Sequence, residues 1–305
     1  MGQASWDTGW FQAQVYKVLL EELGYEVKGP YTLDNLAFHF FTAQGNIDFW
    51  VNGWFPLHEK YFDYQQVQGQ VRPIGYEVDD GALQGYMIDK ATAEEFGITN
   101  LGDLRDPELA ALFDADGDGI ADLIGCNEEW TCDEHIKHHL EAYELEETVN
   151  QIQGNYTELM NEVVARYGNG EPVLFYTWTP NWTVSELAIG EDVMWLSVPF
   201  STSPSSTEVS TVMESISGCL ESPCDMGFEV NDIRVVAGYI FLEENPVAAA
   251  LLLNVTIPLN DIAVQNSLML DGENGEEDLR RHALDWVVTN RNLVDQWLVI
   301  ARDAE

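Results

Sequence analysis

Apolar positions in residues 9–24 recur every three to four residues, a spacing that places them on one face of an α-helix. A second helix is expected over residues 34–44, ended by Gly45. Short apolar strands are expected at 25–27 and at 47–51. This alternation of helix and strand predicts a layered α/β domain with a largely parallel sheet.

The rest of the chain continues the alternation. Expected strands lie at 86–88, 172–177 and 234–237, and expected helices at 133–146, 156–167 and over most of 246–301. Residues 198–227 are rich in Ser, Thr and Pro and are expected to form a long surface excursion.

Composition describes a globular, strongly acidic protein. The 305 residues are 46% apolar, which suits one large or two medium domains. With 13 basic against 53 acidic residues, the formal net charge is −40. Nucleic acid and anionic membrane surfaces are therefore not expected as partners, since both require positive patches. No apolar run reaches the ~18–20 residues of a membrane helix.

The four cysteines form two close pairs, Cys126/Cys132 and Cys219/Cys224. Two local pairs and no other cysteine indicate two short disulfide loops and an oxidising compartment, with buried thiols as the alternative. Neither pair has the spacing of a zinc knuckle. We expect that a leader has been removed ahead of Met1.

Aromatic residues give the strongest indication of a binding site. Four tryptophans are expected at element boundaries: Trp10, Trp54, Trp130 and Trp178. Indole faces bind quaternary ammonium groups by cation–π attraction, about 0.5–2 kcal/mol each, so three or four supply roughly 2–8 kcal/mol. Five others suit core packing: Trp50, Trp182, Trp195, Trp286 and Trp297.

An aspartate-rich loop follows an expected short helix. Its carboxylates occupy positions 1, 3, 5 and 9 of a calcium-loop pattern: Asp114, Asp116, Asp118 and Asp122. The carbonyl of Ile120 would supply position 7, but Gly125 stands where an EF-hand needs glutamate. A calcium-stabilised turn and an ion-free Asx turn both remain open.

Enzymatic signals are weak. The phosphate-loop, nucleophile-elbow, HExxH and dinucleotide motifs do not occur. His135, His138 and His139 lie on a predicted helix among other charges, which favours a solvated face over a metal cluster.

Several segments resemble the periplasmic glycine betaine/proline betaine-binding proteins of ABC importers. They are Trp54–His58, Gln84–Lys90, Phe113–Gly119, Gly125–Asn127 with Trp130 and Cys132, Gln153–Tyr156 and Phe175–Pro180. The resemblance runs through most of the chain. It implies a two-lobed, type II Venus-flytrap fold with the ligand cleft between lobes. Lobe I would comprise 1–88 and 237–305, and lobe II 89–236.

The resemblance also implies a site. Trp54, Trp130 and Trp178 would form an aromatic box. The ligand's anionic end would be held by His58 and by the backbone N–H groups of Thr131 and Cys132. The Cys126–Cys132 disulfide would present Trp130, and Trp10 would add a fourth wall.

Glu128 and Glu129 depart from the family pattern just before Trp130. A carboxylate there repels the carboxylate of a betaine, so trimethylamine N-oxide, sharing a proton with Glu129, is narrowly favoured. If both acids point outward, glycine betaine is the natural ligand; choline is a further alternative.

We therefore expect a non-catalytic, monomeric periplasmic protein that delivers a small methylated ammonium compound to the membrane permease of an ABC importer. No cofactor is expected beyond the possible calcium. The rival is an enzyme acting on methylated amines, for which His58 and Glu129 are the available bases.

Overall fold

The computed structural model describes residues 1–205 and 209–304, and the chain divides into two compact units. Unit 1 comprises Met1–Ala82 and Asn231–Glu305, and unit 2 comprises Leu83–Val230. The chain thus leaves unit 1 once and returns to it once.

The sheet of unit 1 has the strand order β2-β1-β3-β11-β4. Its strands are β1 (Gly2–Gln3), β2 (Tyr31–Thr32), β3 (Phe49–Phe55), β11 (Asn231–Gly238) and the first part of β4 (Val71–Asp89). β1 is parallel to β2 and β3, whereas β11 is antiparallel to β3 and β4. The prediction of a largely parallel sheet is therefore wrong: β4 leads out of the unit and β11 leads back, so they pair in opposite directions.

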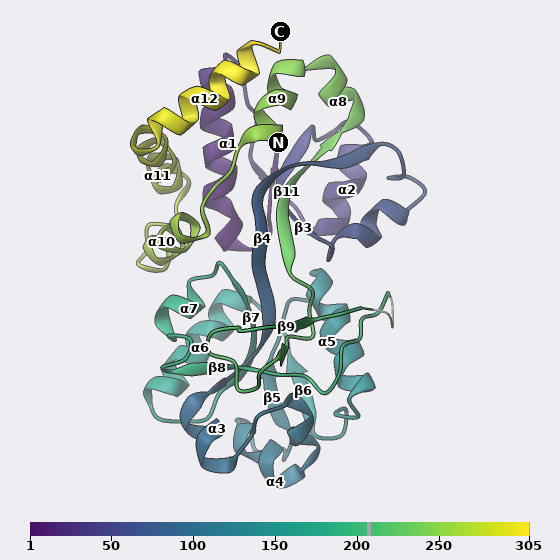
Figure 1. Ribbon diagram of the computed structural model, residues 1–305, viewed down its shortest axis with the longest axis vertical. Helices are drawn as coiled ribbons and strands as arrows, with labels where there is room; N and C mark the ends of the chain where they lie inside the picture. Colours follow the sequence, from purple (N-terminus) through teal and green to yellow (C-terminus); the bar gives the residue numbers. More distant parts are fainter. Residues whose placement is uncertain (206–208, 305) are drawn as a thin grey trace. The chain divides into compact units, whose positions relative to one another are not determined.

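Among the described residues of unit 1, seven α-helices surround this sheet. They are α1 (Trp10–Glu22), α2 (Asn35–Ala43), α8 (Tyr239–Glu244), α9 (Pro246–Asn254), α10 (Leu259–Leu270), α11 (Glu276–Thr289) and α12 (Arg291–Arg302), with 3-10 turns at Asp7–Gly9 and Glu59–Asp63. α1 and α2 lie on opposite sides of the sheet, and α1 packs against α11 (Figure 1).

The two predicted N-terminal helices are confirmed, but the strand between them is misplaced. The carboxylate of Asp34 accepts from Ala37 N (2.7 Å) and so caps α2. The expected strand at 25–27 is irregular: the chain leaves α1 through Gly24 at φ 93°, and pairing with β1 begins only at Tyr31.

Unit 2 has the strand order β4-β7-β5-β6, with β8 also paired to β4. These are β5 (Ala121–Ile124), β6 (Val149–Ile152), β7 (Leu174–Thr179) and β8 (Val193–Leu196); β9 (Val212–Met213) and β10 (Cys224–Asp225) form a separate pair. Helices are α3 (Lys90–Phe96), α4 (Pro107–Ala110), α5 (Thr131–Ala142), α6 (Tyr156–Gly168) and α7 (Thr183–Glu186), with 3-10 turns at Leu101–Arg105 and Ala111–Phe113.

The predicted solvated histidine face on α5 is wrong. His139 is buried, and its Nδ1 lies 2.7 Å from the Tyr86 hydroxyl. The ring of His135 stacks on Phe228. His138 Nε2 meets the hydroxyl of Thr202 at 2.8 Å. The excursion that carries Thr202 therefore packs onto α5 instead of lying wholly on the surface.

Burial and disulfides follow the sequence-based expectations. The five tryptophans assigned to the core are buried: Trp50, Trp182, Trp195, Trp286 and Trp297. Both disulfides are formed, Cys126–Cys132 and Cys219–Cys224. Among the described residues, no single helix is long and apolar enough to cross a membrane. The helices Pro246–Asn254 and Leu259–Leu270, bent by 93° relative to each other, reach that length and apolar composition only when taken together.

Candidate functional site

Three aromatic rings from three elements of unit 2 form one cluster. Trp130 immediately precedes α5, Tyr156 begins α6, and Trp178 is the penultimate residue of β7. The ring centroids of Trp130 and Trp178 are 5.6 Å apart at 80°, and those of Tyr156 and Trp178 are 4.6 Å apart. The edge-to-face contact of the two indoles and the tilted contact of Tyr156 with Trp178 orient the rings, so the cluster offers fixed π faces to a cation.

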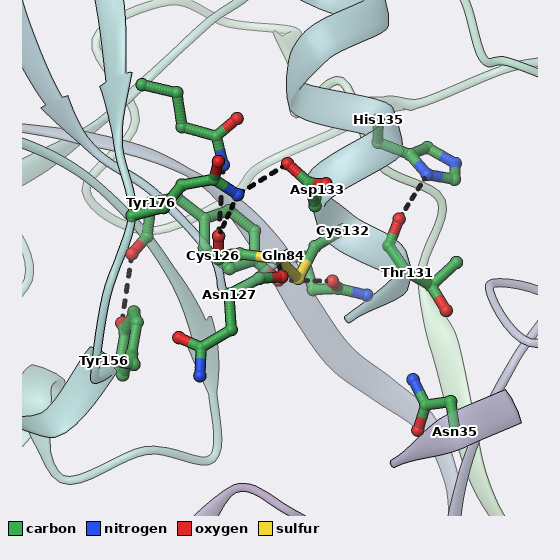
Figure 2. Close-up of a disulfide and its surroundings, with 12 residues drawn as sticks. Asn35, Gln84, Cys126, Asn127, Thr131, Cys132, Asp133, His135, Tyr156 and Tyr176 are labelled. Atoms are coloured by element: carbon green, nitrogen blue, oxygen red, sulfur yellow. Dashed lines mark hydrogen bonds between the residues drawn. A yellow bond between two sulfur atoms is a disulfide. The ribbon is translucent and has the colours of Figure 1, made fainter. Parts of the chain in front are cut away.

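Tyr156 is part of this cluster, and sequence reasoning did not select it. Its hydroxyl lies 3.0 Å from the carbonyl oxygen of Tyr176, to which it donates (Figure 2). Tyr176 in turn donates its hydroxyl to Gln84 Oε1 at 2.6 Å. The hydroxyl thus anchors the Tyr156 ring to β7, the strand that carries Trp178. The feature of the sequence that could have identified Tyr156 is its position at the start of a predicted helix.

The disulfide loop before α5 is held by hydrogen bonds to Cys126 and Asp133 (Figure 2). Gln153 Nε2 donates to the carbonyl oxygen of Cys126 (3.0 Å) and to Asp133 Oδ1 (2.7 Å). Gln151 Nε2 also reaches the Cys126 oxygen, at 3.2 Å. Asp133 accepts from Lys137 Nζ (2.8 Å), an ion pair that balances its charge. These contacts fix the loop that positions Trp130.

The N-terminus of α5 can receive an anion. Thr131 and Cys132 are its first two residues, and Trp130 before them cannot cap the helix because an indole has no acceptor. The backbone N–H groups of a first helical turn attract negative charge. Thr131 and Cys132 are both buried, so a carboxylate bound there would be removed from water.

Unit 1 carries a second group of candidates. Trp54 is buried as the penultimate residue of β3, and its Nε1 donates to Asn52 Oδ1 at 3.0 Å. Trp6 Nε1 donates to the same oxygen at 2.8 Å. The ring centroids of Trp6 and His58 are 6.1 Å apart. Trp6 and Asn52 were missed because neither stands out locally.

His58 is a neutral hydrogen-bonding group in this arrangement. Its Nδ1 accepts the backbone N–H of Trp54 (3.0 Å), which leaves the ring proton on Nε2. Nε2 lies 3.3 Å from Asn35 Nδ2. Burial lowers the pKa of His58 well below its usual value, and the charges of His39 and Lys60 act in the same direction. His58 can therefore donate to a carboxylate but adds no positive charge.

Trp10, the expected fourth wall, has a hydrogen-bond partner different from that of Trp6 and Trp54. Its Nε1 donates to the carbonyl oxygen of Ala4 (2.9 Å). The indole instead lines a small cavity of about 140 Å³ with residues that include Gln14 and Glu276.

Glu128 and Glu129 are exposed, whereas Trp130 beside them is buried. Solvent screens the charge of both carboxylates, so neither occupies a buried position from which it would strongly repel a ligand's carboxylate.

The aspartate loop gathers three of its four carboxylates. Oxygens of Asp114, Asp116 and Asp122 lie within 4.8 Å of one another, and Asp118 falls outside that group. Asp114 accepts from Gly117 N (2.6 Å) and from Gly119 N (2.8 Å). These backbone N–H groups lower the pKa of Asp114. Such Asx turns are compatible with either an ion-bound or an ion-free loop.

Comparison with known proteins shows a match over nearly the whole chain. The family described as "Substrate binding domain of ABC-type glycine betaine transport system" matches residues 1–289. The glycine betaine-binding periplasmic protein OusX of Dickeya dadantii (strain 3937) is 41% identical over 294 residues, 96% of this chain and 86% of that protein. The glycine betaine/proline betaine-binding periplasmic protein of Escherichia coli (strain K12) is 40% identical over 288 residues, 94% and 85% of the two chains.

Solved structures share the fold at low sequence identity. Lactococcal OpuAC, in a closed conformation complexed with glycine betaine, superposes with a TM-score of 0.70 at 18% identity, covering 97% of this chain and 98% of that one. An ABC-transporter choline-binding protein in complex with choline gives 0.71 at 17% identity, covering 98% and 91%. These likenesses confirm the predicted α/β binding-protein fold.

Proposed function

Because the chain belongs to the family of substrate-binding domains of ABC-type glycine betaine transport systems, we propose that it captures glycine betaine or a close relative for an ABC importer. This proposal rests mainly on the family match over residues 1–289. The Trp130–Tyr156–Trp178 cluster supports it, because π faces recognise an ammonium group that cannot donate hydrogen bonds. Aromatic binding of this kind needs no cofactor, and the chain is a binding protein rather than an enzyme.

The ligand's two ends would be bound by different chemistry. We propose that Trp54, Trp130 and Trp178 contact the trimethylammonium group. Its carboxylate would accept hydrogen bonds from the N-terminal N–H groups of α5 and from His58 Nε2. Since His58 is neutral, this end is bound by dipoles and hydrogen bonds rather than by an ion pair.

Glycine betaine replaces trimethylamine N-oxide as the favoured ligand. The preference for the N-oxide required Glu129 to share a proton with the ligand, and Glu129 is exposed. The relatives at about 40% identity are named for glycine betaine and proline betaine. Choline is the second candidate, because a solved structure of this fold is complexed with it.

Calorimetric titration with glycine betaine, proline betaine, choline and trimethylamine N-oxide tests the proposal. We expect the betaines to bind with the highest affinity. Glu129→Gln should change betaine affinity less than about twofold, because an exposed charge is screened by solvent. Tight N-oxide binding that Glu129→Gln abolishes would restore the ligand preference derived from sequence. Chemical turnover of any of the four compounds would contradict a binding role.

Delivery requires a membrane permease as partner. The curated relatives are named periplasmic proteins, and we propose the same compartment for this chain. Two disulfides suit that oxidising environment. We also propose that the protein is a monomer, which sedimentation at several concentrations tests. A concentration-dependent dimer would contradict this.

A further inference from the structure

We propose that Trp6 is a further aromatic wall for the ligand's ammonium group, and that Asn52 is the positioning residue that fixes Trp6 and Trp54 as a pair. This inference rests on the proposed function, since it assigns residues to the same quaternary ammonium ligand.

One oxygen atom joins the two indoles. Asn52 Oδ1 accepts from Trp6 Nε1 at 2.8 Å and from Trp54 Nε1 at 3.0 Å. An amide oxygen has two lone pairs, so it can accept both N–H groups. Neither ring can turn away without leaving a buried N–H unpaired, which costs about 1–3 kcal/mol. The shared acceptor therefore fixes both ring orientations together.

The strand and the N-terminal segment bring these groups together. Trp50, Asn52 and Trp54 alternate along β3 and so lie on one face of the strand. Gly9 allows the N-terminal segment to approach them, because a Cβ atom there would lie 3.1 Å from Asn52 Oδ1. A larger residue at position 9 would therefore crowd the oxygen that accepts from both indoles.

The surroundings of Trp6 tie it to both the core and the candidate site. Its ring meets the fully buried Trp50 edge-on, at a centroid distance of 5.8 Å and 74°. The centroid of its ring also lies 6.1 Å from that of His58, the residue proposed to donate a hydrogen bond to the ligand's carboxylate. With its one donor used by Asn52, an indole offers a ligand only its π face. A π face is the surface that recognises a quaternary ammonium.

Trp10, the fourth wall expected from sequence, is the competing candidate. Its indole N–H donates to the carbonyl oxygen of Ala4 rather than to Asn52, and the indole lines the cavity of about 140 Å³ described above. The two tryptophans lie close in sequence and are chemically identical. Parallel substitution therefore separates the hypotheses.

The test compares Trp6→Leu with Trp10→Leu, titrated calorimetrically with glycine betaine and with tetramethylammonium. Trp6→Leu should weaken both ligands by about 3- to 30-fold, the range of one cation–π contact. Tetramethylammonium has no carboxylate, so equal losses place the effect on the ammonium group. A loss with Trp10→Leu and none with Trp6→Leu would overturn the inference, as would a loss confined to glycine betaine.

Asn52 is tested by what its substitutions do to the two indoles. In Asn52→Leu, the indole N–H resonances of Trp6 and Trp54 should both shift, and tetramethylammonium should bind about tenfold more weakly. Asn52→Asp keeps an acceptor for both N–H groups and should retain tetramethylammonium binding. Unshifted resonances, or equal losses in both variants, would refute the positioning role.

Two further outcomes keep the hypotheses separate. If the wild-type protein binds no quaternary ammonium compound, the proposed function fails. If it binds glycine betaine and folded Trp6→Leu binds equally well, only this inference fails.

Should Trp6→Leu not fold, Trp6→Phe replaces it in the test. Phenylalanine keeps a π face, so this variant should retain tetramethylammonium binding to within about tenfold. Loss of binding beyond that would contradict the inference.

Discussion

Glu77 is a carboxyl group in the interior of unit 1, where water cannot solvate its charge. It lies on β4, 1% exposed, beside the hydroxyl of Tyr16 on α1. Burial raises the pKa of Glu77 well above its usual value, and the smaller, opposite effect of the nearby Tyr16 hydroxyl does not cancel this. The carboxyl group is therefore protonated in the folded protein under conditions where it ionises in the unfolded chain.

Glu77→Gln should remove a pH-dependent loss of stability. Folding raises the pKa of Glu77. Its contribution to the free energy of unfolding is therefore fully present below about pH 4.5 and is lost as pH rises towards the pKa of the folded state. The slope approaches about 1.4 kcal/mol per pH unit. Urea unfolding at several pH values above 4.5 should show a flatter profile for Glu77→Gln. The exposed Glu243→Gln is the matched control, and identical profiles for both variants would refute the prediction.

Single residues also show where local pattern is insufficient. Glu129 and Trp130 are neighbours in sequence, yet one is exposed and the other buried. Composition and spacing identified Trp130 as a binding candidate because its chemistry is distinctive. They could not decide the direction of Glu129, since that depends on how the disulfide loop meets α5.

At the scale of elements, the loop before α5 combines covalent and polar restraints. The Cys126–Cys132 disulfide closes it, and Gln153 holds its carbonyl oxygen. The loop leads directly into Trp130 and the first turn of α5. Both ends of the ligand would thus depend on one short segment.

Removing this disulfide should weaken ligand binding more than removing the other. Cys126→Ser/Cys132→Ser should lower glycine betaine affinity at least about tenfold, because Trp130 and the α5 N–H groups lose preorganisation. Cys219→Ser/Cys224→Ser is the matched control, since that bridge lies beside the β9–β10 pair. Calorimetry of both variants, each checked for folding by circular dichroism, makes the comparison. Equal affinities in the two variants would contradict a specific role for the first bridge.

The aspartate loop gives a second prediction at this scale. If calcium stabilises the group of Asp114, Asp116 and Asp122, chelation should lower the melting temperature and Asp116→Asn should reduce the effect. If the loop is an ion-free Asx turn, chelation should change nothing. Thermal melts with EDTA and with added calcium distinguish the two. Magnesium at the same ionic strength controls for general screening of the carboxylates.

At the scale of the whole molecule, burial of neutral histidines makes the fold sensitive to acid. Burial lowers the pKa of His39 in unit 1 to about 4 and that of His139 in unit 2 to about 3. Both side chains are neutral when folded but take up a proton when unfolded. Each unit therefore contains a group whose protonation opposes folding.

The contribution of His39 and His139 to stability should fall as pH is lowered from about 6.5 towards 3–4, because the unfolded state then binds more protons at these two side chains. His139→Gln should flatten the acid slope of unit 2 and leave that of unit 1 unchanged. Native-state hydrogen exchange at a series of pH values reports both units separately. Equal acid slopes of unit 2 in the wild type and in His139→Gln would be inconsistent with this expectation.

The net charge of −40 has a different consequence at this scale. Self-repulsion among 53 acidic residues weakens the compact state and is screened by salt. Added salt should therefore stabilise the fold.

The sequence by itself determined what local pattern can encode. Helical periodicity located α1 and α2, short cysteine spacings indicated both disulfides, and tryptophans near strand ends indicated the class of ligand. These features depend on residues only a few positions apart.

Tertiary structure alone decided which side chains meet. Trp6 and Asn52 are 46 residues apart in sequence, and their hydrogen bond exists only because the N-terminal segment packs on β3. His139 is buried because residues around Thr202 fold back onto α5, which its own helical pattern cannot reveal. Periodicity reports the face of an element, whereas the partner of that face is set by packing between distant segments.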